Sequence, residues 1–358
     1  MTPLDGRLVS APPCRSPFVV RLHRGGASGE DEAEFDQDQD GVVWVRSRRG
    51  AFTCIMADPW ADLDETVLLV APERGRVFRL IRPGPGRDNT LLLTEACDQA
   101  CLFCAQPPRP RHHAFWDLYR TAVRLAPAGA VIGLTGGEPL LLKDSLFSWV
   151  LDCHAERPDL GFHLLTNAQG VTAADVPTLR ALAGWVLWGV PLCGPDAASH
   201  DAMVRKAGAW DRLLESLDFL AQTGAAVELR TVLAAPTLVR LPRLADFVAR
   251  HLPWVETWAL MHMEAQGLAR RFWESLAVAP EDAFDTLGPA LSIAQTAGLP
   301  ISLYNFPRCL VPEAWRPLAV ASISDWKRAY GPECEACSER PGCSGFFASN
   351  PPPGGFPS

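Results

Sequence analysis

The sequence has no continuous apolar run of about 20 residues, which is the length needed to span a membrane, and residues 1–20 contain no apolar core typical of secretion signals. No basic stripe dominates any segment, and the formal net charge is -8. Membrane insertion, secretion and a nucleic-acid interface are therefore not indicated, and we expect a cytoplasmic protein with no nucleic-acid or membrane partner.

Cysteine, by contrast, is abundant. There are eleven cysteines, and because a reducing compartment disfavours disulfides, clustered cysteines indicate metal ligands. Three follow a predicted strand with the spacing C-x3-C-x2-C: Cys97, Cys101 and Cys104. Four near the C-terminus have the spacing C-x24-C-x2-C-x5-C: Cys309, Cys334, Cys337 and Cys343. The sequence therefore predicts two separate metal centres.

The sequence pattern divides the chain into three parts. Residues 1–86 contain short β-like runs around an acidic stretch, 29–40, and we expect a small, mostly β module of unknown role in which that stretch is a solvated loop. Residues 87–300 alternate apolar runs with amphipathic segments. Residues 301–358 have little apolar periodicity and are predicted to fold around a metal centre.

The alternating part predicts an α/β fold in which six β/α units form a partial parallel barrel, or else an open doubly wound sheet. In either architecture the chemistry is expected at the C-terminal ends of the strands. The three-cysteine loop occupies such a position. A four-iron cluster ordinarily takes four thiolates, so three would leave one iron open to another ligand. The competing interpretation is a tetrahedral zinc site completed by His112 or His113.

The loop, with the aromatic Phe103 before its third cysteine, resembles the signature of the radical S-adenosylmethionine (SAM) superfamily. The next predicted strand ends in "LTGGEPL", which resembles the second motif of that superfamily through Gly136, Gly137, Glu138 and Pro139. The resemblance implies a radical SAM barrel with a [4Fe-4S] cluster whose open iron binds SAM. It also implies reductive cleavage of SAM to a 5′-deoxyadenosyl radical, with the second motif receiving the methionine amino group and its glycines admitting a ligand close to the backbone.

Further polar residues follow the later strands. Thr166 and Asn167 resemble the polar pair of the third strand, which implies contact with the ribose or methionine of SAM; an Asn turn is the alternative. The fourth unit resembles that of peptide-modifying radical enzymes, and Arg205 is expected to contact the cofactor. In the same unit, His200 and Asp201 are either site residues or a helix N-cap pair.

Two charged residues lie in otherwise apolar strand ends. Arg230 ends the fifth predicted strand, and Glu264 ends the sixth. A charge in an apolar strand is costly unless it is paired, so both are predicted either as catalytic pocket residues or as members of buried ion pairs.

The second cysteine set fills all four positions of a metal centre, so it predicts a closed [4Fe-4S] cluster or a structural zinc site. The radical SAM resemblance favours an auxiliary cluster, because this segment resembles the auxiliary-cluster domains of radical enzymes that modify peptides. Such a cluster either accepts an electron from the substrate radical or stabilises a segment poor in apolar residues.

The segments "CLFCAQPP" and "SISDWKRAYGPECEACSERPGCSGFF" resemble the HxsC-type radical SAM maturase of the His-Xaa-Ser system over about residues 89–350. The resemblance implies a ribosomally synthesised precursor peptide (RiPP) as substrate, a partner radical SAM maturase and an external electron donor. The alternatives are a sulfatase-maturase-like peptide oxidase, another RiPP maturase, or a noncatalytic zinc or electron-transfer module. "TGGEPL" argues against the last of these, because an electron carrier has no amino acid group to receive.

Overall fold

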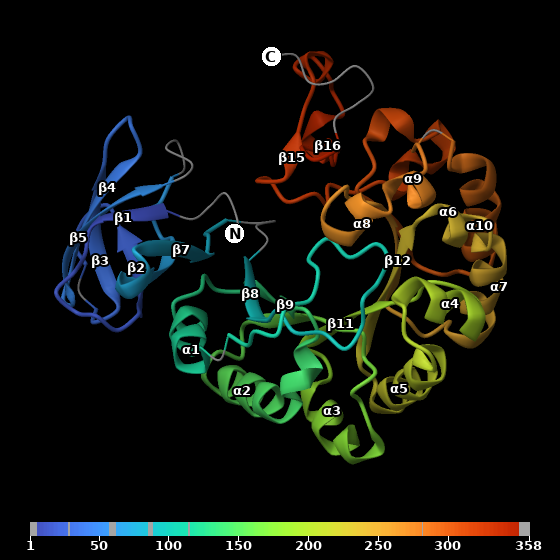
Figure 1. The fold of residues 1–358 in the computed structure, drawn as a ribbon, viewed down its shortest axis with the longest axis horizontal. Helices are drawn as coiled ribbons and strands as arrows, with labels where there is room; N and C mark the ends of the chain where they lie inside the picture. The colour runs from blue at the N-terminus through green and yellow to red at the C-terminus, as the bar shows by residue number, and fades with distance from the viewer. Residues whose placement is uncertain are drawn as a thin grey trace. The chain divides into compact units, whose positions relative to one another are not determined.

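The structure, a computed structural model, describes residues 6–27, 29–56, 62–84, 89–113, 115–280 and 282–350 (Figure 1). The chain forms two compact units. The first comprises Met1–Leu93, His113–Leu134 and Asp144–Phe162, and the second comprises Thr94–His112, Thr135–Lys143 and His163–Ser358. The predicted domain boundary at 86/87 falls outside the described residues. Within the described chain, no helix is both long and apolar enough to cross a membrane.

The N-terminal part is a closed β-barrel with the strand order β1-β5-β4-β3-β2-β6-β7. Its strands are β1 Gly6–Ser10, β2 Phe18–His23, β3 Glu32–Gln37, β4 Val42–Ser47, β5 Gly50–Met56, β6 Val67–Ala71 and β7 Arg76–Ile81. Alternating apolar side chains fill it, among them Leu22, Val43, Val45, Phe52 and Val77. The predicted mostly β module is confirmed.

The expectation that residues 29–40 form a solvated loop is wrong for β3. Ala33 and Phe35 are buried in the barrel core, whereas Asp36 is exposed. β3 pairs antiparallel with β4, in a register that sets Phe35 opposite Val45. The acidic residues occupy the outward-facing positions of an amphipathic strand. Their charge made the segment look like a loop, although its apolar residues recur at every second position.

A second sheet has seven strands in the order β14-β13-β12-β11-β10-β9-β8. These are β8 Asn89–Thr94, β9 Val131–Gly136, β10 Gly161–Leu165, β11 Val186–Pro191, β12 Ala226–Leu233, β13 Thr257–His262 and β14 Ile301–Tyr304. The pairs β11–β12, β12–β13 and β13–β14 are parallel. The predicted α/β fold with a parallel sheet is confirmed, and β14 extends the six predicted units by one strand.

The connecting helices are α1 Trp116–Arg124, α2 Lys143–Glu156, α3 Val176–Leu182, α4 Ala197–Val204, α5 Ala209–Thr223, α6 Ala235–Leu238, α7 Leu241–His251, α8 Gly267–Arg271, α9 Trp273–Leu276 and α10 Phe284–Thr296. In α5, buried Trp210, Leu213, Leu217 and Leu220 recur at helical spacing and form one apolar face. The helix ends at Gly224, whose φ of 70° suits glycine. Within the second unit, α5 lies beside α3 and α4 (Figure 1).

The residues after β14 are irregular, as the sequence predicts. They form short 3₁₀ turns and one two-stranded pair, β15 Arg328–Ala329 with β16 Phe346–Phe347. Three of those turns contain or adjoin the C-terminal cysteines: Arg308–Leu310, Pro332–Cys334 and Arg340–Gly342.

Candidate active site

The three-cysteine loop follows β8 directly and is held by backbone hydrogen bonds to the end of α4. The Leu102 amide donates to the Met203 carbonyl at 2.9 Å, and the Ala100 amide donates to the Val204 carbonyl at 3.3 Å. Phe103 packs against the apolar cluster that contains Met203 and Val204. The loop therefore has a defined shape set by elements distant in sequence.

The three thiols of this loop lie close enough to influence one another. Burial raises the pKa of Cys97 to about 11, and the charges of Glu138, Asp98 and Cys104 add to that rise. Burial also raises the pKa of Cys101, with contributions from Cys193, Cys104 and Cys97. Three mutually repelling thiolates in a desolvated place need a compensating cation, so the donor set fits a bound iron–sulfur cluster.

Spacing also bears on the kind of metal. A tetrahedral zinc ion with Zn–S bonds of about 2.3 Å holds its sulfurs roughly 3.8 Å apart. In the described part of the chain, one group has three possible metal ligands whose atoms all lie within 4.8 Å of one another. It consists of His23, Asp64 and Glu65, and it contains no cysteine. Neither cysteine set has three sulfurs that all lie within 4.8 Å of one another. Thiolates of a four-iron cluster bind different irons and therefore lie farther apart.

His112 and His113, the fourth ligands considered for zinc, follow the loop. His112 Nδ1 lies 2.9 Å from the hydroxyl of Thr94. The backbone amide of His113 donates to the Leu93 carbonyl at 2.9 Å. One ring nitrogen of His112 is thus already engaged at the end of β8.

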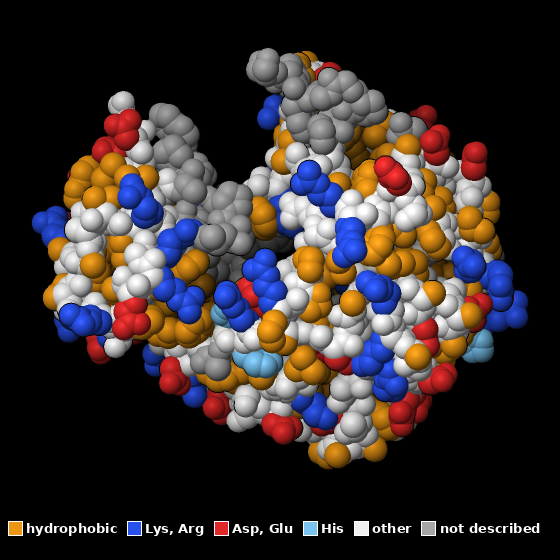
Figure 2. Space-filling view, in the orientation of Figure 1, with side chains coloured by type: hydrophobic (Ala, Val, Ile, Leu, Met, Phe, Trp, Pro, Cys, Tyr) orange, Lys and Arg blue, Asp and Glu red, His pale blue; other side chains and the backbone are white. Residues whose placement is uncertain are grey.

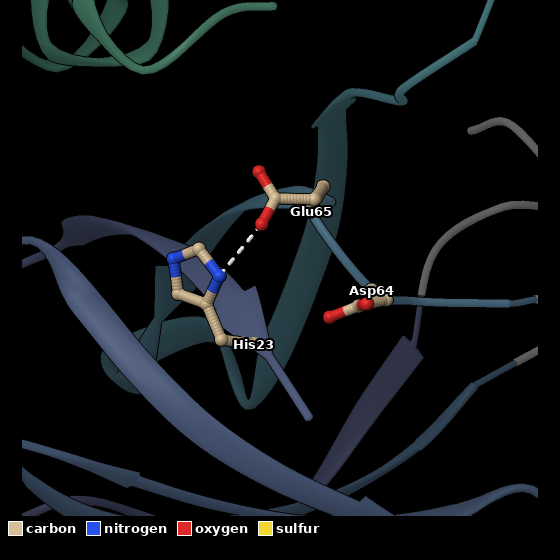
Figure 3. Close-up of side chains that lie close together, drawn as sticks. All are labelled: His23, Asp64 and Glu65. Carbon is tan, nitrogen blue, oxygen red and sulfur yellow. Dashed lines mark ion pairs between the residues drawn. The ribbon is translucent and has the colours of Figure 1, made fainter. Parts of the chain in front are cut away.

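The His23 group belongs to the N-terminal barrel (Figure 3). His23 Nδ1 lies 2.7 Å from Glu65, and its Nε2 lies 3.5 Å from Glu32. Arg21 also pairs with both of these carboxylates. Arg21 and His23 thus already engage the carboxylates of Glu32 and Glu65.

The second motif, at the end of β9, is attached to the cysteine loop by its backbone. The Gly137 amide donates to the Thr94 carbonyl and the Glu138 amide to the Ala96 carbonyl, each at 2.8 Å. A Cβ on Gly136 would lie 2.1 Å from the Thr94 oxygen, and one on Gly137 would lie 2.1 Å from the Ala96 oxygen. The glycines therefore allow the two motifs to touch, a packing role that the sequence-based expectation of ligand approach did not include.

The carboxylate of Glu138 is buried and joins two strand ends. It accepts hydrogen bonds from the Leu140 amide at 2.8 Å, the Thr166 hydroxyl at 2.5 Å and the Asn167 amide at 2.6 Å. Burial outweighs these donors and raises the pKa of Glu138 to about 7. Pro139 is the first residue of the 3₁₀ turn that Glu138 caps. The side chain of Glu138 thus organises the site, beside any contact it makes with a ligand.

Asn167 links the turn after β10 to the cysteine loop. Its side-chain amide donates to Asp98 at 2.7 Å, and its carbonyl oxygen accepts from the Gln169 amide at 3.0 Å. The Asn turn considered as an alternative is therefore present. Asp98 also pairs with Lys206, and neither of these residues was expected in the site. The position of Asp98 directly after the first motif cysteine is the signal that could have identified it.

His200 and Asp201, for which a helix N-cap pair was the alternative to a site role, do not cap α4. The N-cap of α4 is Asp196, which accepts from the Ser199 amide. Asp201 instead accepts from the amides of Gly208 and Trp210 at the start of α5, at 2.6 and 2.8 Å. His200 is buried inside α4, and its Nδ1 accepts from the backbone amide of Cys193 at 3.3 Å. The pair thus holds the segment after β11 in place.

Arg230 lies in a polar cluster on neighbouring strands. It pairs with Glu228 on β12, and its guanidinium carbon lies 5.8 Å from the ring centre of Tyr304 on β14. Tyr304 donates to Glu228 at 3.0 Å, and His163 on β10 lies 3.5 Å from the same carboxylate. Burial alone would raise the pKa of Glu228, but His163 and Arg230 lower it to about 2. Arg230 thus has an ion-pair partner on its own strand, and alternation from Arg230 could have identified Glu228.

Glu264 meets the C-terminal segment just after β13. Its Oε2 accepts from Lys327 at 2.7 Å, whereas its buried Oε1 has no hydrogen-bond partner among the described residues. Asn350 is hydrogen-bonded to the backbone on either side of Glu264. Its side chain donates to the Met263 carbonyl at 2.9 Å and accepts from the Ala265 amide at 2.6 Å. One carboxylate oxygen of Glu264 is therefore available to a further donor.

The C-terminal cysteines line one cavity of about 240 Å³: Cys309, Cys334, Cys337 and Cys343. The amides of Arg308 and Gly345 each donate to the sulfur of Cys343 at 3.3 Å. Burial raises the pKa of Cys309, and the charges of the other three cysteines add to it. The arrangement fits a closed four-thiolate centre.

The comparisons with known proteins agree with these motifs. A family model described as the radical SAM superfamily matches residues 91–235. An AdoMet-dependent heme synthase from Nitratidesulfovibrio vulgaris is 25% identical over 154 residues, which cover 41% of this chain and 40% of that protein. The chain thus matches less than half the length of this curated relative.

Solved structures also resemble this chain. Native anSMEcpe with bound AdoMet and Cp18Cys peptide has a TM-score of 0.50 and 12% identity, over 60% of this chain and 62% of that one. Streptococcus suis SuiB bound to precursor peptide SuiA has a TM-score of 0.48 and 14% identity, over 61% of this chain and 48% of that one. The radical SAM family model thus matches residues 91–235, and the likeness to anSMEcpe shows a shared fold.

Proposed function

We propose that this protein is a radical SAM enzyme that modifies a ribosomally synthesised precursor peptide of the His-Xaa-Ser type. The observation that carries the proposal is the direct contact between the cysteine loop and the second motif. The backbone amides of Gly137 and Glu138 donate hydrogen bonds to the start of the cysteine loop. An isolated metal-binding loop does not need this second element. A noncatalytic zinc or electron-transfer module is therefore the weaker interpretation.

Cys97, Cys101 and Cys104 would hold the [4Fe-4S] cluster. When bound, the cluster and SAM would supply the electron and the carbon-centred radical. The protein's own residues fix the geometry: Asp98 and Glu138 join the loop to the strand ends that follow it. Phe103, Thr166 and Asn167 remain the proposed cofactor contacts, as does Arg205. A rigid site of this kind orients the cofactor and limits side reactions with water.

The peptide class rests on the C-terminal segment. Its four cysteines line one cavity, and four thiolates are the full ligand set of an auxiliary [4Fe-4S] cluster. Glu264, with one oxygen available, and Arg230 are the proposed substrate-facing residues. The expected partners are the peptide, an external electron donor and a second radical SAM maturase. A sulfatase-maturase-like peptide oxidase remains the alternative, since anSMEcpe shares this fold and was solved with a peptide.

The test is anaerobic incubation of the reconstituted protein with SAM, dithionite and a synthetic peptide bearing His-Xaa-Ser repeats. We expect 5′-deoxyadenosine and a mass change in that peptide. Modification of a Cys- or Ser-containing sulfatase-type peptide instead would favour the alternative. If no 5′-deoxyadenosine forms with any peptide, the proposed enzyme class is wrong.

A further inference from the structure

Arginine side chains without an ion-pair partner gather beside the cysteine loop, although the chain has a formal net charge of -8. They lie at the end of α4 and in α8: Arg205, Arg270 and Arg271. All three are exposed, and no carboxylate in the described part of the chain lies within the 4.0 Å that defines an ion pair with them. Nearby Lys206, by contrast, pairs with Asp98. These three charges are therefore open to an outside partner.

Arg205 is attached to the cysteine loop through the end of α4. The carbonyls of Met203 and Val204 accept hydrogen bonds from the loop amides of Leu102 and Ala100. Arg205 is the next residue along the chain. Its position is therefore fixed relative to the cysteines by two backbone hydrogen bonds.

α8 reaches the same loop from the other end of the sequence. The Leu268 amide donates to the Cys104 carbonyl at 2.8 Å. Gly267 has a φ of 58°, and a Cβ there would lie 2.6 Å from the Cys104 oxygen, so only glycine permits this approach. Arg270 and Arg271 follow within one helical turn and so also lie beside the loop.

Phe272 brings the two groups of charges together. The guanidinium carbons of Arg205 and Arg271 lie 6.0 and 5.6 Å from the centre of its ring. Phe272 packs against the same apolar cluster as Cys101 and Phe103. On the face drawn in Figure 2, Lys and Arg side chains lie over the region of α8. Two like charges on one ring repel each other, and an anionic partner would relieve that repulsion.

We infer that Arg270 and Arg271, which lie beside the proposed cofactor contact Arg205, form a docking surface for an acidic protein that carries a one-electron centre. The inference rests on the proposed function, because reductive cleavage of SAM takes one electron from outside the chain. In the transfer, the carrier would lose one electron, and a cluster held by Cys97, Cys101 and Cys104 would gain it. The arginines lie within three residues of backbone contacts to the loop, so a carrier docked here lies next to the cysteines. Exposed cations at such an interface mainly raise the association rate.

The test compares Arg270→Gln/Arg271→Gln with a matched control that also loses two exposed arginines, Arg180→Gln/Arg250→Gln on α3 and α7. Flavodoxin, an acidic flavin protein, is the probe. Its binding is measured by calorimetry, and its reduction of the cluster by stopped-flow absorbance. We expect the first variant to bind flavodoxin, and to be reduced by it, about tenfold less well at low salt. The difference should shrink at high salt. Reduction by dithionite should be equal in all proteins.

Equal flavodoxin binding by the two double variants would overturn the docking surface. A loss confined to binding of an acidic peptide would also overturn it and would assign the arginines to substrate recognition. Failure of dithionite to support SAM cleavage would overturn the proposed function instead. The comparison of flavodoxin binding does not require a bound cluster. It therefore tests the docking surface even if SAM is not cleaved.

Discussion

The side-chain amide of Asn167 donates a 2.7 Å hydrogen bond to the carboxylate of Asp98. The turn after β10 is thereby joined to the residue that follows the first cysteine of the loop. The same carboxylate pairs with Lys206, just beyond α4. Three segments distant in sequence share one acidic group, so the geometry of the loop depends on residues outside the cysteine motif.

We expect Asp98→Ala and Asn167→Ala each to lower the free energy of unfolding of the metal-free protein by about 1–2 kcal/mol, because each removes a hydrogen bond to a charged group that is partly exposed. Anaerobic urea denaturation measures this. The double variant should cost less than the sum of the single variants. If the effects of the two single variants add, the two residues do not interact. The control variant is Asp62→Ala, which removes an exposed carboxylate in the barrel part of the chain.

Gly137→Ala should displace the cysteine loop, because the new Cβ would lie 2.1 Å from the Ala96 oxygen. Overpacking of this kind costs about 1–3 kcal/mol or more. Iron retained after anaerobic reconstitution should fall relative to Gly25→Ala, where nothing lies within 4 Å of the added Cβ. Full iron retention by the Gly137 variant would contradict the close contact between the two motifs.

Burial lowers the pKa of His200 to about 4, from an ordinary value of 6.5. A depressed pKa contributes stability that is present above about pH 6.5 and lost as the pH falls through about 4. The free energy of unfolding should therefore decline over that range, by on the order of 3 kcal/mol. His200→Gln keeps an acceptor for the Cys193 amide but does not titrate. An identical pH profile for variant and wild type would contradict the buried neutral imidazole.

Lys327 balances the largely buried carboxylate of Glu264. Lys327→Met should destabilise the protein by about 3 kcal/mol, because it leaves a buried charge unpaired. Adding Glu264→Gln removes that charge and should recover part of the loss. Urea denaturation of the metal-free single and double variants checks this prediction. If the Lys327→Met/Glu264→Gln variant is less stable than Lys327→Met alone, the loss does not come from an unpaired charge on Glu264.

Much of the fold was predictable because buried parallel strands are continuous apolar runs, as β11 and β13 illustrate. The motif residues were predictable because their spacing is local. β3 was not predicted, because its acidic side chains hid the alternation of Ala33 and Phe35. Strand periodicity had to be considered separately from charge.

The partners of site residues were less predictable, because they depend on tertiary contacts. Asp201 caps α5 and not its own helix, and only the packing of α4 against α5 reveals this. The carboxylate of Glu138 is enclosed by donors from a strand end 28 residues away in sequence. The sequence identified these residues as important without specifying what they contact.

We propose that the chain holds two separate iron–sulfur centres and that the one at the three-cysteine loop supports SAM cleavage. The direct measurement is iron, zinc and 5′-deoxyadenosine in the anaerobically reconstituted variant in which Cys97, Cys101 and Cys104 are all replaced by Ala. We expect about four irons per chain, no zinc and no 5′-deoxyadenosine, because the C-terminal thiolates are a separate set. Undiminished SAM cleavage, or stoichiometric zinc with no iron, would contradict this account.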